Sequence, residues 1–213
     1  MYVPTHFEET RVEVMHELMC AHPFATLVTL TSQGLNANHI PLELQADPAP
    51  LGILRGHIAR TNPLWRDLSS DVNALAIFQG TNRYISPAWY PTKEETGKVV
   101  PTWNYAVVHA HGPLRVIEDR DWLRQLVGRL TDHHESNRSK PWSVSDAPPD
   151  YIEKTLDAIV GLEMPIVRLI GKWKVSQNRP AKDQAGIVEN LLREGDESSK
   201  AMADLVRQFN RIE

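Results

Sequence analysis

The segments YISPAWYP (84–91) and VPTWNYAVVHAHG (100–112) stand on either side of a short polar insert in this 213-residue chain. Residues 102–117 predict a long strand, rich in β-branched and aromatic residues, that bends at Gly112-Pro113. The same stretch sets aromatic rings and prolines beside hydroxyls, an amide and two histidines. A packed core seldom needs that mixture, because buried Tyr and Trp must find partners for their polar atoms. A pocket for a flat ligand with polar edges does need it.

On either side of this segment, hydrophobic periodicity and turn residues predict the other helices and strands. We expect strands at 24–31, 35–44, 51–58, 72–78 and 160–175, and helices at 8–20, 62–69, 119–135, 146–158, 183–194 and 198–211. Early antiparallel strands, a helical excursion, a return strand and a helical tail indicate an α+β fold. Such strands close most easily into a small barrel with helices outside. We expect one domain over 1–192, with a helical insertion around 119–158, and a C-terminal helical tail over 193–213.

Composition narrows the class of protein. The formal net charge of −4 gives no electrostatic reason to expect nucleic-acid binding. The apolar runs fall short of the roughly 20 residues that a membrane helix requires. One cysteine, Cys20, excludes an internal disulfide and a multi-cysteine zinc site. The first residues lack the pattern of a signal peptide, so we expect a cytoplasmic protein.

A candidate anion site follows the strand at 51–58. His57, Arg60, Thr61 and Asn62 precede a predicted helix, whose first N–H groups and dipole favour an anion. Arg60 adds a planar fork suited to phosphate oxygens, and Thr61 adds a hydroxyl donor. The alternative is structural, with Asn62 serving only as a helix cap and His57 as a half-buried histidine. The nearby aromatic segment favours phosphate binding.

The aromatic segment supplies residues suited to a flavin ring. An isoalloxazine needs apolar faces for stacking and hydrogen-bond partners along its pyrimidine edge. Ser86, Thr102, Trp103 and Asn104 are the right residue types for this role. In the alternative, Trp103 only fills a barrel mouth and residues 92–98 form a disordered hairpin tip.

Two further features carry weaker predictions. His109 and His111 point to the same face of a strand, but no metal-binding motif accompanies them, and we predict no metal site. Residues 168–182 hold five cations and no acid. We interpret them as a strand end whose lysines extend past apolar neighbours, with a phosphate-contacting patch as the alternative.

Several motifs in combination resemble one known family. They are MYVP (1–4), GHIARTNP (56–63), YISPAWY (84–90), VPTWNY (100–105), DAP (146–148), GLE (161–163) and GKWKVSQNR (171–179). Together they resemble the PaiB-type family of FMN-binding negative transcriptional regulators. The resemblance implies a split β-barrel of the pyridoxamine-phosphate-oxidase-like class, with FMN as cofactor. It also implies a homodimer with flavin between the subunits, residues 57–62 on the phosphate side, and Trp103 and Asn104 near the ring.

Three functions stay open from the sequence. The first is a cytoplasmic, dimeric, FMN-binding transcriptional regulator. Direct DNA recognition has little support, since the acidic junction at 194–197 between the last two helices would face phosphates. The second is a flavin-dependent oxidoreductase acting on a small molecule. The third is a haem-handling split barrel with His6, His109 or His111 as the axial ligand.

Overall fold

The computed structural model describes residues 1–47, 50–69 and 71–212. The chain packs as two compact units. Unit 1 comprises Met1–Ala21, Gln79–His109 and the chain from Ile170 onward, and unit 2 comprises His22–Phe78 and Ala110–Leu169. Three strands, β6 (Ala74–Ile85), β7 (Thr102–Gly112) and β10 (Arg168–Lys174), contribute residues to both units.

The sheet of unit 1 has the strand order β1-β10-β7-β6. Strand β1 (Glu8–Glu9) follows the short 3-10 helix η1 (Thr5–Phe7) and pairs antiparallel with β10, with Glu8 opposite Lys172. Helix α1 (Val12–Ala21) comes next and buries Met15, Leu18 and Met19. A Cβ on Gly171 would lie 2.8 Å from the Met15 sulfur, so glycine lets α1 approach the sheet closely.

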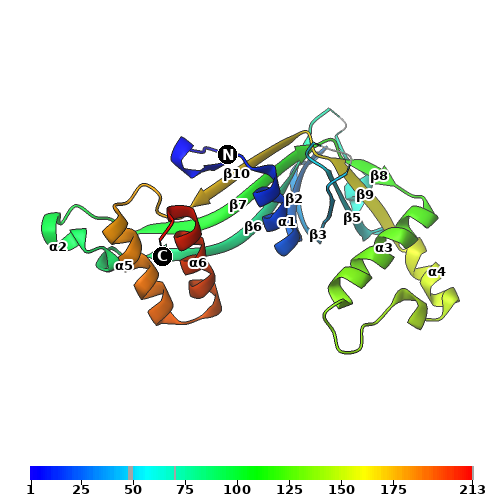
Figure 1. Cartoon of the computed structure of the whole chain (residues 1–213). Coiled ribbons are helices and arrows are strands. Elements are labelled where there is room, and N and C mark those ends of the chain that lie inside the picture. Colours follow the sequence, from blue (N-terminus) through cyan, green and yellow to red (C-terminus); the bar gives the residue numbers. More distant parts are fainter. Residues whose placement is uncertain (48–49, 70, 213) are drawn as a thin grey trace. The chain divides into compact units, whose positions relative to one another are not determined.

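Helices α5 (Ala181–Glu194) and α6 (Glu197–Asn210) lie side by side in unit 1 (Figure 1). Gly195, at φ 77°, ends α5, and the Asp196 side chain caps α6 by accepting from the Ser199 N–H at 3.1 Å. The pair buries an apolar seam made by Ile187, Val188, Leu191, Met202, Ala203 and Val206. Phe209 of α6 stacks on Trp173 of β10, with ring centroids 5.8 Å apart.

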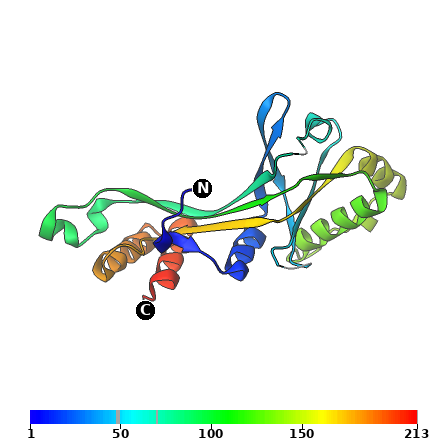
Figure 2. The same cartoon turned by 90° about the horizontal axis from the view of Figure 1, so that it is seen from above.

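Within unit 1, β6 and β7 are joined by a connection that carries η3 (Pro87–Trp89) and α2 (Thr92–Thr96), as Figure 2 shows. This connection docks on α5. The buried Asp183 carboxylate accepts from the Thr92 N–H at 3.1 Å and from the Thr92 hydroxyl at 2.8 Å. A Cβ on Gly186 would lie 2.3 Å from the Trp89 carbonyl oxygen. The residues that one alternative treated as a disordered tip therefore contain a helix anchored by a buried carboxylate.

Unit 2 contains the hairpin of β2 (Phe24–Thr31) and β3 (Gly34–Pro41), with Leu30 opposite Leu35. Strand β2 also pairs antiparallel with the start of β6. The second sheet of the unit has the order β4-β5-β9-β8, made of β4 (Glu43–Gln45), β5 (Ile53–Ala59), β9 (Ile159–Pro165) and β8 (Arg115–Ile117). Its buried side chains include Leu54, Ile58 and Leu162.

The helical excursion of unit 2 consists of α3 (Arg120–Glu135), η4 (Val144–Asp146) and α4 (Pro149–Asp157). Asp119 caps α3 by accepting from the Trp122 N–H at 2.7 Å. The helices share an apolar cluster formed by Leu123, Ile152 and Leu156. Gly161 lies beneath this excursion, because a Cβ there would meet the Trp122 ring at 2.4 Å.

The predicted α+β class with antiparallel strands is confirmed, and several boundaries need correction. The helix predicted over 8–20 begins only at Val12, because residues 8–9 pair with β10. The strand predicted over 160–175 is two strands, β9 and β10, and the helix predicted over 62–69 is the 3-10 turn η2 (Pro63–Arg66). The strand predicted over 72–78 continues to Ile85. None of the described helices has the length and apolar character needed to cross a membrane.

Candidate functional site

The predicted site residues fall into two groups, one in each unit. His57, Arg60, Thr61 and Asn62 lie together in unit 2, around the end of β5, whereas Ser86, Thr102, Trp103 and Asn104 lie in unit 1, on the β6–β7 connection and the start of β7. The structure therefore brings together the residues within each group. The expected contact of both groups with one ligand stays a prediction.

His57 occupies the middle of β5, opposite Gly161 of β9. Its Nδ1 atom is buried and has no hydrogen-bond partner among the described residues. Burial lowers the pKa of this imidazole below its ordinary value of 6.5. A buried polar atom without a partner costs free energy. His57 is thus a neutral ring with a buried nitrogen that has no partner among the described residues.

Arg60 is already engaged in unit 2. Its Nε donates to the Asp157 carbonyl at 2.8 Å, Nη1 donates to the Glu118 carboxylate at 2.7 Å, and Nη2 donates to the Ile159 carbonyl at 3.1 Å. The guanidinium also lies 5.5 Å from the centre of the Trp65 ring. Arg60 thereby ties the end of β5 to the junction of α4 and β9. A guanidinium has more N–H groups than these acceptors use, so part of the fork is left for an anion.

Asn62 and Thr61 differ in their surroundings. The Asn62 side chain caps η2 by accepting from the Leu64 N–H at 3.0 Å, and its amide donates to Asn38 at 2.8 Å. The capping role that the sequence left open is therefore present. Thr61 is exposed. Since η2 has only four residues, an anion at this site would be held by side chains more than by a helix dipole.

In the group that lies in unit 1, Trp103 is 54% exposed to solvent, and the neighbouring Tyr84 is 47% exposed. Their rings meet edge to face, with centroids 6.1 Å apart and planes at 71°. Ser86 caps η3 by accepting from the Ala88 N–H at 3.2 Å. Two large rings that remain this exposed leave apolar area for a ligand to cover.

Lys174 of β10 supports this region and was missed by the sequence analysis. Its ammonium donates to the Thr102 hydroxyl and, at 2.7 Å, to the Trp103 carbonyl. Burial, together with the charges of Lys172 and Arg179, lowers the pKa of Lys174. The available signal was the run of cations over 168–182. Two lysines of that run bind the backbone of segments that are distant in sequence, because Lys172 also donates to the Tyr2 carbonyl at 3.1 Å.

Asn104 lies in the interior of unit 1 and is fully buried. Its amide donates to the Ser176 hydroxyl at 2.9 Å, and that hydroxyl donates back to the Asn104 oxygen at 3.2 Å. Ser176 has φ 68°, a left-handed conformation that few residues other than glycine adopt. This pair supplies a structural role that the sequence did not indicate, and a contact of Asn104 with flavin stays a prediction.

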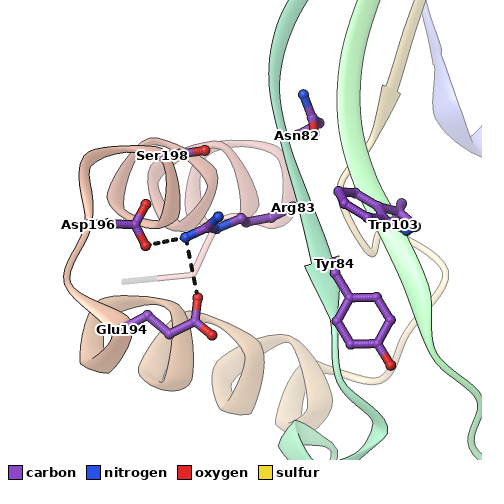
Figure 3. Close-up of a pocket in the computed structure, with 7 residues that line it drawn as sticks. All are labelled: Asn82, Arg83, Tyr84, Trp103, Glu194, Asp196 and Ser198. Atoms are coloured by element: carbon purple, nitrogen blue, oxygen red, sulfur yellow. Dashed lines mark hydrogen bonds and ion pairs between the residues drawn. The ribbon is translucent and has the colours of Figure 1, made fainter.

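A pocket of about 450 Å³ opens beside the aromatic pair in unit 1 (Figure 3). It is lined by Asn82, Arg83, Tyr84, Trp103, Glu194, Asp196 and Ser198. Figure 3 shows the Arg83 side chain reaching from β6 toward the α5–α6 junction, where it pairs with Asp196 and lies 3.7 Å from Glu194. Arg83 Nε also donates to the Ser199 hydroxyl at 2.8 Å. The pocket thus combines exposed rings with a charged wall.

Of the histidines considered for a metal or haem, His6 and His109 belong to unit 1 and His111 belongs to unit 2. His111 is in unit 2 beside Arg168, whose Nη2 lies 3.3 Å from His111 Nε2. Burial and the charge of Arg168 lower the pKa of His111. Within the described residues, His, Cys, Asp and Glu side chains form no group of three or more suited to a metal ion.

Comparison with known structures gives the class of fold. The chain resembles the flavocytochrome Anf3 of Azotobacter vinelandii, with 12% identity, a TM-score of 0.59, and coverage of 81% of this chain and 72% of that chain. It also resembles the FAD and heme binding protein of Mycobacterium smegmatis, with 17% identity, a TM-score of 0.55, and coverage of 78% and 73%. These likenesses show the fold, an antiparallel split β-barrel with peripheral helices.

Comparison of sequences gives the family. Residues 1–168 match the family described as "Putative FMN-binding domain". The chain is 33% identical over 207 residues to the protease synthase and sporulation protein PAI 2 of Bacillus subtilis, covering 97% of this chain and 96% of that protein. It is 32% identical to the protein AN0679 of Emericella nidulans, covering 98% and 97%. The chain therefore belongs to the PaiB-type FMN-binding family, and its cofactor is FMN.

Proposed function

We propose that the protein is a cytoplasmic, homodimeric negative transcriptional regulator of the PaiB type that holds FMN between its subunits. The observation that carries the proposal is the correspondence with PAI 2 along 97% of the chain, which includes residues of both units. The name of that relative refers to protease synthesis and sporulation, two cellular programmes. Such a name favours a role in regulation over the catalysis of a single reaction.

The two residue groups suit the two ends of FMN. On the phosphate side, His57 offers a buried nitrogen without a partner, Arg60 offers the rest of its fork, and Thr61 offers an exposed hydroxyl. On the ring side, Trp103 offers an exposed aromatic face, and Ser86 and Thr102 offer hydroxyls. When bound, FMN would supply an isoalloxazine able to accept and donate electrons. The chain's own part is to bind and orient it, with Lys174 holding the backbone of Trp103 in place.

Replacing Trp103 by leucine is expected to raise the dissociation constant of FMN at least tenfold, because the ring-stacking face is lost; tenfold corresponds to about 1.4 kcal/mol. Quenching of flavin fluorescence during titration into the apoprotein measures this constant. Trp142→Leu is the matched control, since Trp142 is 46% exposed and lies in unit 2, outside both groups. Equal FMN affinity in the two variants would remove Trp103 from the flavin site.

The regulatory role predicts binding to DNA upstream of genes that the protein controls. A gel shift with the region upstream of its own gene should give a complex that survives an excess of unrelated DNA at about 150 mM salt. Light scattering should give twice the chain mass of 24.1 kDa. Failure to shift this DNA even at low salt would argue against direct repression. Anaerobic reduction of the flavin by NADH or NADPH would instead favour the oxidoreductase.

A further inference from the structure

We propose that the pocket beside Tyr84 and Trp103 binds a small organic cation, an amine carried on a flat apolar group. This site goes beyond the FMN and DNA functions proposed above, and its occupant would be a second ligand of the protein. All seven residues that line the pocket belong to unit 1.

The aromatic wall consists of Tyr84 and Trp103, and neither ring has an arginine or lysine stacked against it among the described residues. Elsewhere, Arg60 and Arg66 lie against Trp65, Arg55 lies against Trp122, Lys172 lies against Tyr105, and Arg179 lies against Tyr90. Within the described residues, Tyr84 and Trp103 have no such neighbour, although both are about half exposed. An aromatic face attracts a cation. The Tyr84 ring, which the proposed flavin site does not use, can therefore receive one from outside.

The charged wall favours a positive ligand. Its two carboxylates, Glu194 and Asp196, outnumber its single guanidinium, Arg83. Asp196 is already engaged, because it accepts from the Ser199 N–H at 3.1 Å, from the Ser199 hydroxyl at 2.8 Å and from Arg83. The hydrogen bonds from Ser199, with the charge of Arg83, lower the pKa of Asp196, so this carboxylate stays ionised at neutral pH.

Glu194 is the carboxylate with capacity to spare. Its Oε2 lies 2.8 Å from the Ser199 hydroxyl oxygen, whose single hydrogen is shared with Asp196, and 3.7 Å from Arg83 Nη2. Its Oε1 has no hydrogen-bond partner within the described part of the chain, and Figure 3 shows this carboxylate on the same side of the pocket as Arg83 and Asp196. An ammonium donor could use that oxygen while its apolar part covers Tyr84, the pocket ring that the proposed flavin site does not use. The Asn82 side chain supplies a further polar contact.

The size of the pocket limits the ligand. About 450 Å³ lies at the small end of the range of roughly 300–1,000 Å³ that is usual for ligand pockets. One aromatic ring with a short aminoalkyl chain fits this volume. A carboxylate on the same frame would meet Glu194 and Asp196 and be repelled.

Three probes of one shape test the proposal by calorimetry on the FMN-loaded protein, in which the face of Trp103 assigned to the flavin is occupied. They are phenethylamine, the neutral phenethyl alcohol and the anionic 3-phenylpropionate. We expect the amine to bind with a dissociation constant on the order of 1 mM or below, at least tenfold tighter than the alcohol, and the anion to bind most weakly. Equal affinities for the three probes, or no saturable binding of the amine, would overturn the proposal.

Two single-residue variants test whether the amine binds in this pocket. Glu194→Gln keeps an oxygen for Ser199 but removes the charge, and it should weaken amine binding about tenfold without changing binding of the alcohol. Glu189→Gln is the matched control, because Glu189 lies on the same helix, is 70% exposed and pairs with Arg193. An identical amine affinity in the two variants would place the amine elsewhere. FMN affinity should be unchanged in Glu194→Gln, so failure here is distinguishable from failure of flavin binding.

Discussion

Replacement of Gly112 by alanine is expected to lower the free energy of unfolding by about 3 kcal/mol, the upper end of the usual cost of overpacking. A Cβ at this position would lie 2.0 Å from the Pro165 carbonyl oxygen and 3.1 Å from Met164 Cγ. The nearest atom belongs to the backbone at the end of β9, so no side-chain rotation can relieve the clash. Either β7 or β9 must shift, and both contribute to the structure of unit 2.

Gly128→Ala is the control for this substitution, with the opposite sign expected. Gly128 lies within helix α3, and a Cβ there would have no atom within 4 Å. Alanine should therefore stabilise the protein by up to about 1 kcal/mol through its higher helix propensity. Urea unfolding of the two variants beside the parent chain measures both changes. Comparable stability of the Gly112 and Gly128 variants would contradict the close approach of β7 to Pro165.

Replacement of Asn104 by alanine is expected to destabilise the protein by about 2 kcal/mol, since it leaves the buried Ser176 hydroxyl without its partner. Ser176 keeps its left-handed backbone only while its surroundings hold it there. Asn36→Ala is the matched control, because Asn36 is exposed and its hydrogen bond to Asn38 is at the surface. Urea unfolding compares the two asparagines.

The same Asn104 variant decides between two roles for this residue. If Asn104 only supports the interior of unit 1, the folded variant should bind FMN within about threefold of the parent affinity, a difference below 1 kcal/mol. If it also contacts the flavin ring, as its place in the VPTWNY motif suggests, affinity should fall tenfold or more. Flavin titration well below the unfolding transition separates these results.

Local patterns predicted the helices well. The helices expected over 119–135, 183–194 and 198–211 begin and end within two residues of α3, α5 and α6. Each has a sustained apolar stripe and a capping residue or glycine next to it, so its limits are set by neighbours in sequence. The bend at Gly112-Pro113 was also anticipated, because β7 ends at Gly112 and β8 begins at Arg115.

Pairing between distant segments was harder to predict. Glu8 and Glu9 look like the acidic first turn of a helix, yet they form β1 because β10 offers them an edge. Residues 92–96 contain few apolar side chains, and their helix depends on Asp183, 91 residues beyond Thr92. The residue types of so short a segment cannot indicate a partner that lies far away in the sequence.

For the candidate site, residue types were informative and residue partners were not. The mixture of rings, prolines and hydroxyls at 84–112 pointed to a flat ligand, and the family comparison agrees that the cofactor is FMN. The same reading could not foresee that Arg60 would be engaged by Asp157 and Ile159, or that Asn104 would be paired with Ser176. It also passed over Lys174, whose contact with Trp103 spans 71 residues of sequence.

The sequence by itself determined the class of this protein, its family, its cofactor and most of its helices, since these follow from composition, from motifs and from interactions between near neighbours. Only the tertiary structure decided which polar groups are satisfied and which remain open. His57 Nδ1 and Glu194 Oε1 have no hydrogen-bond partner in the described structure, whereas the Arg60 and Asn104 side chains are engaged. The physical reason is that a hydrogen bond forms between atoms brought together in space, and the partners here come from segments far apart along the chain.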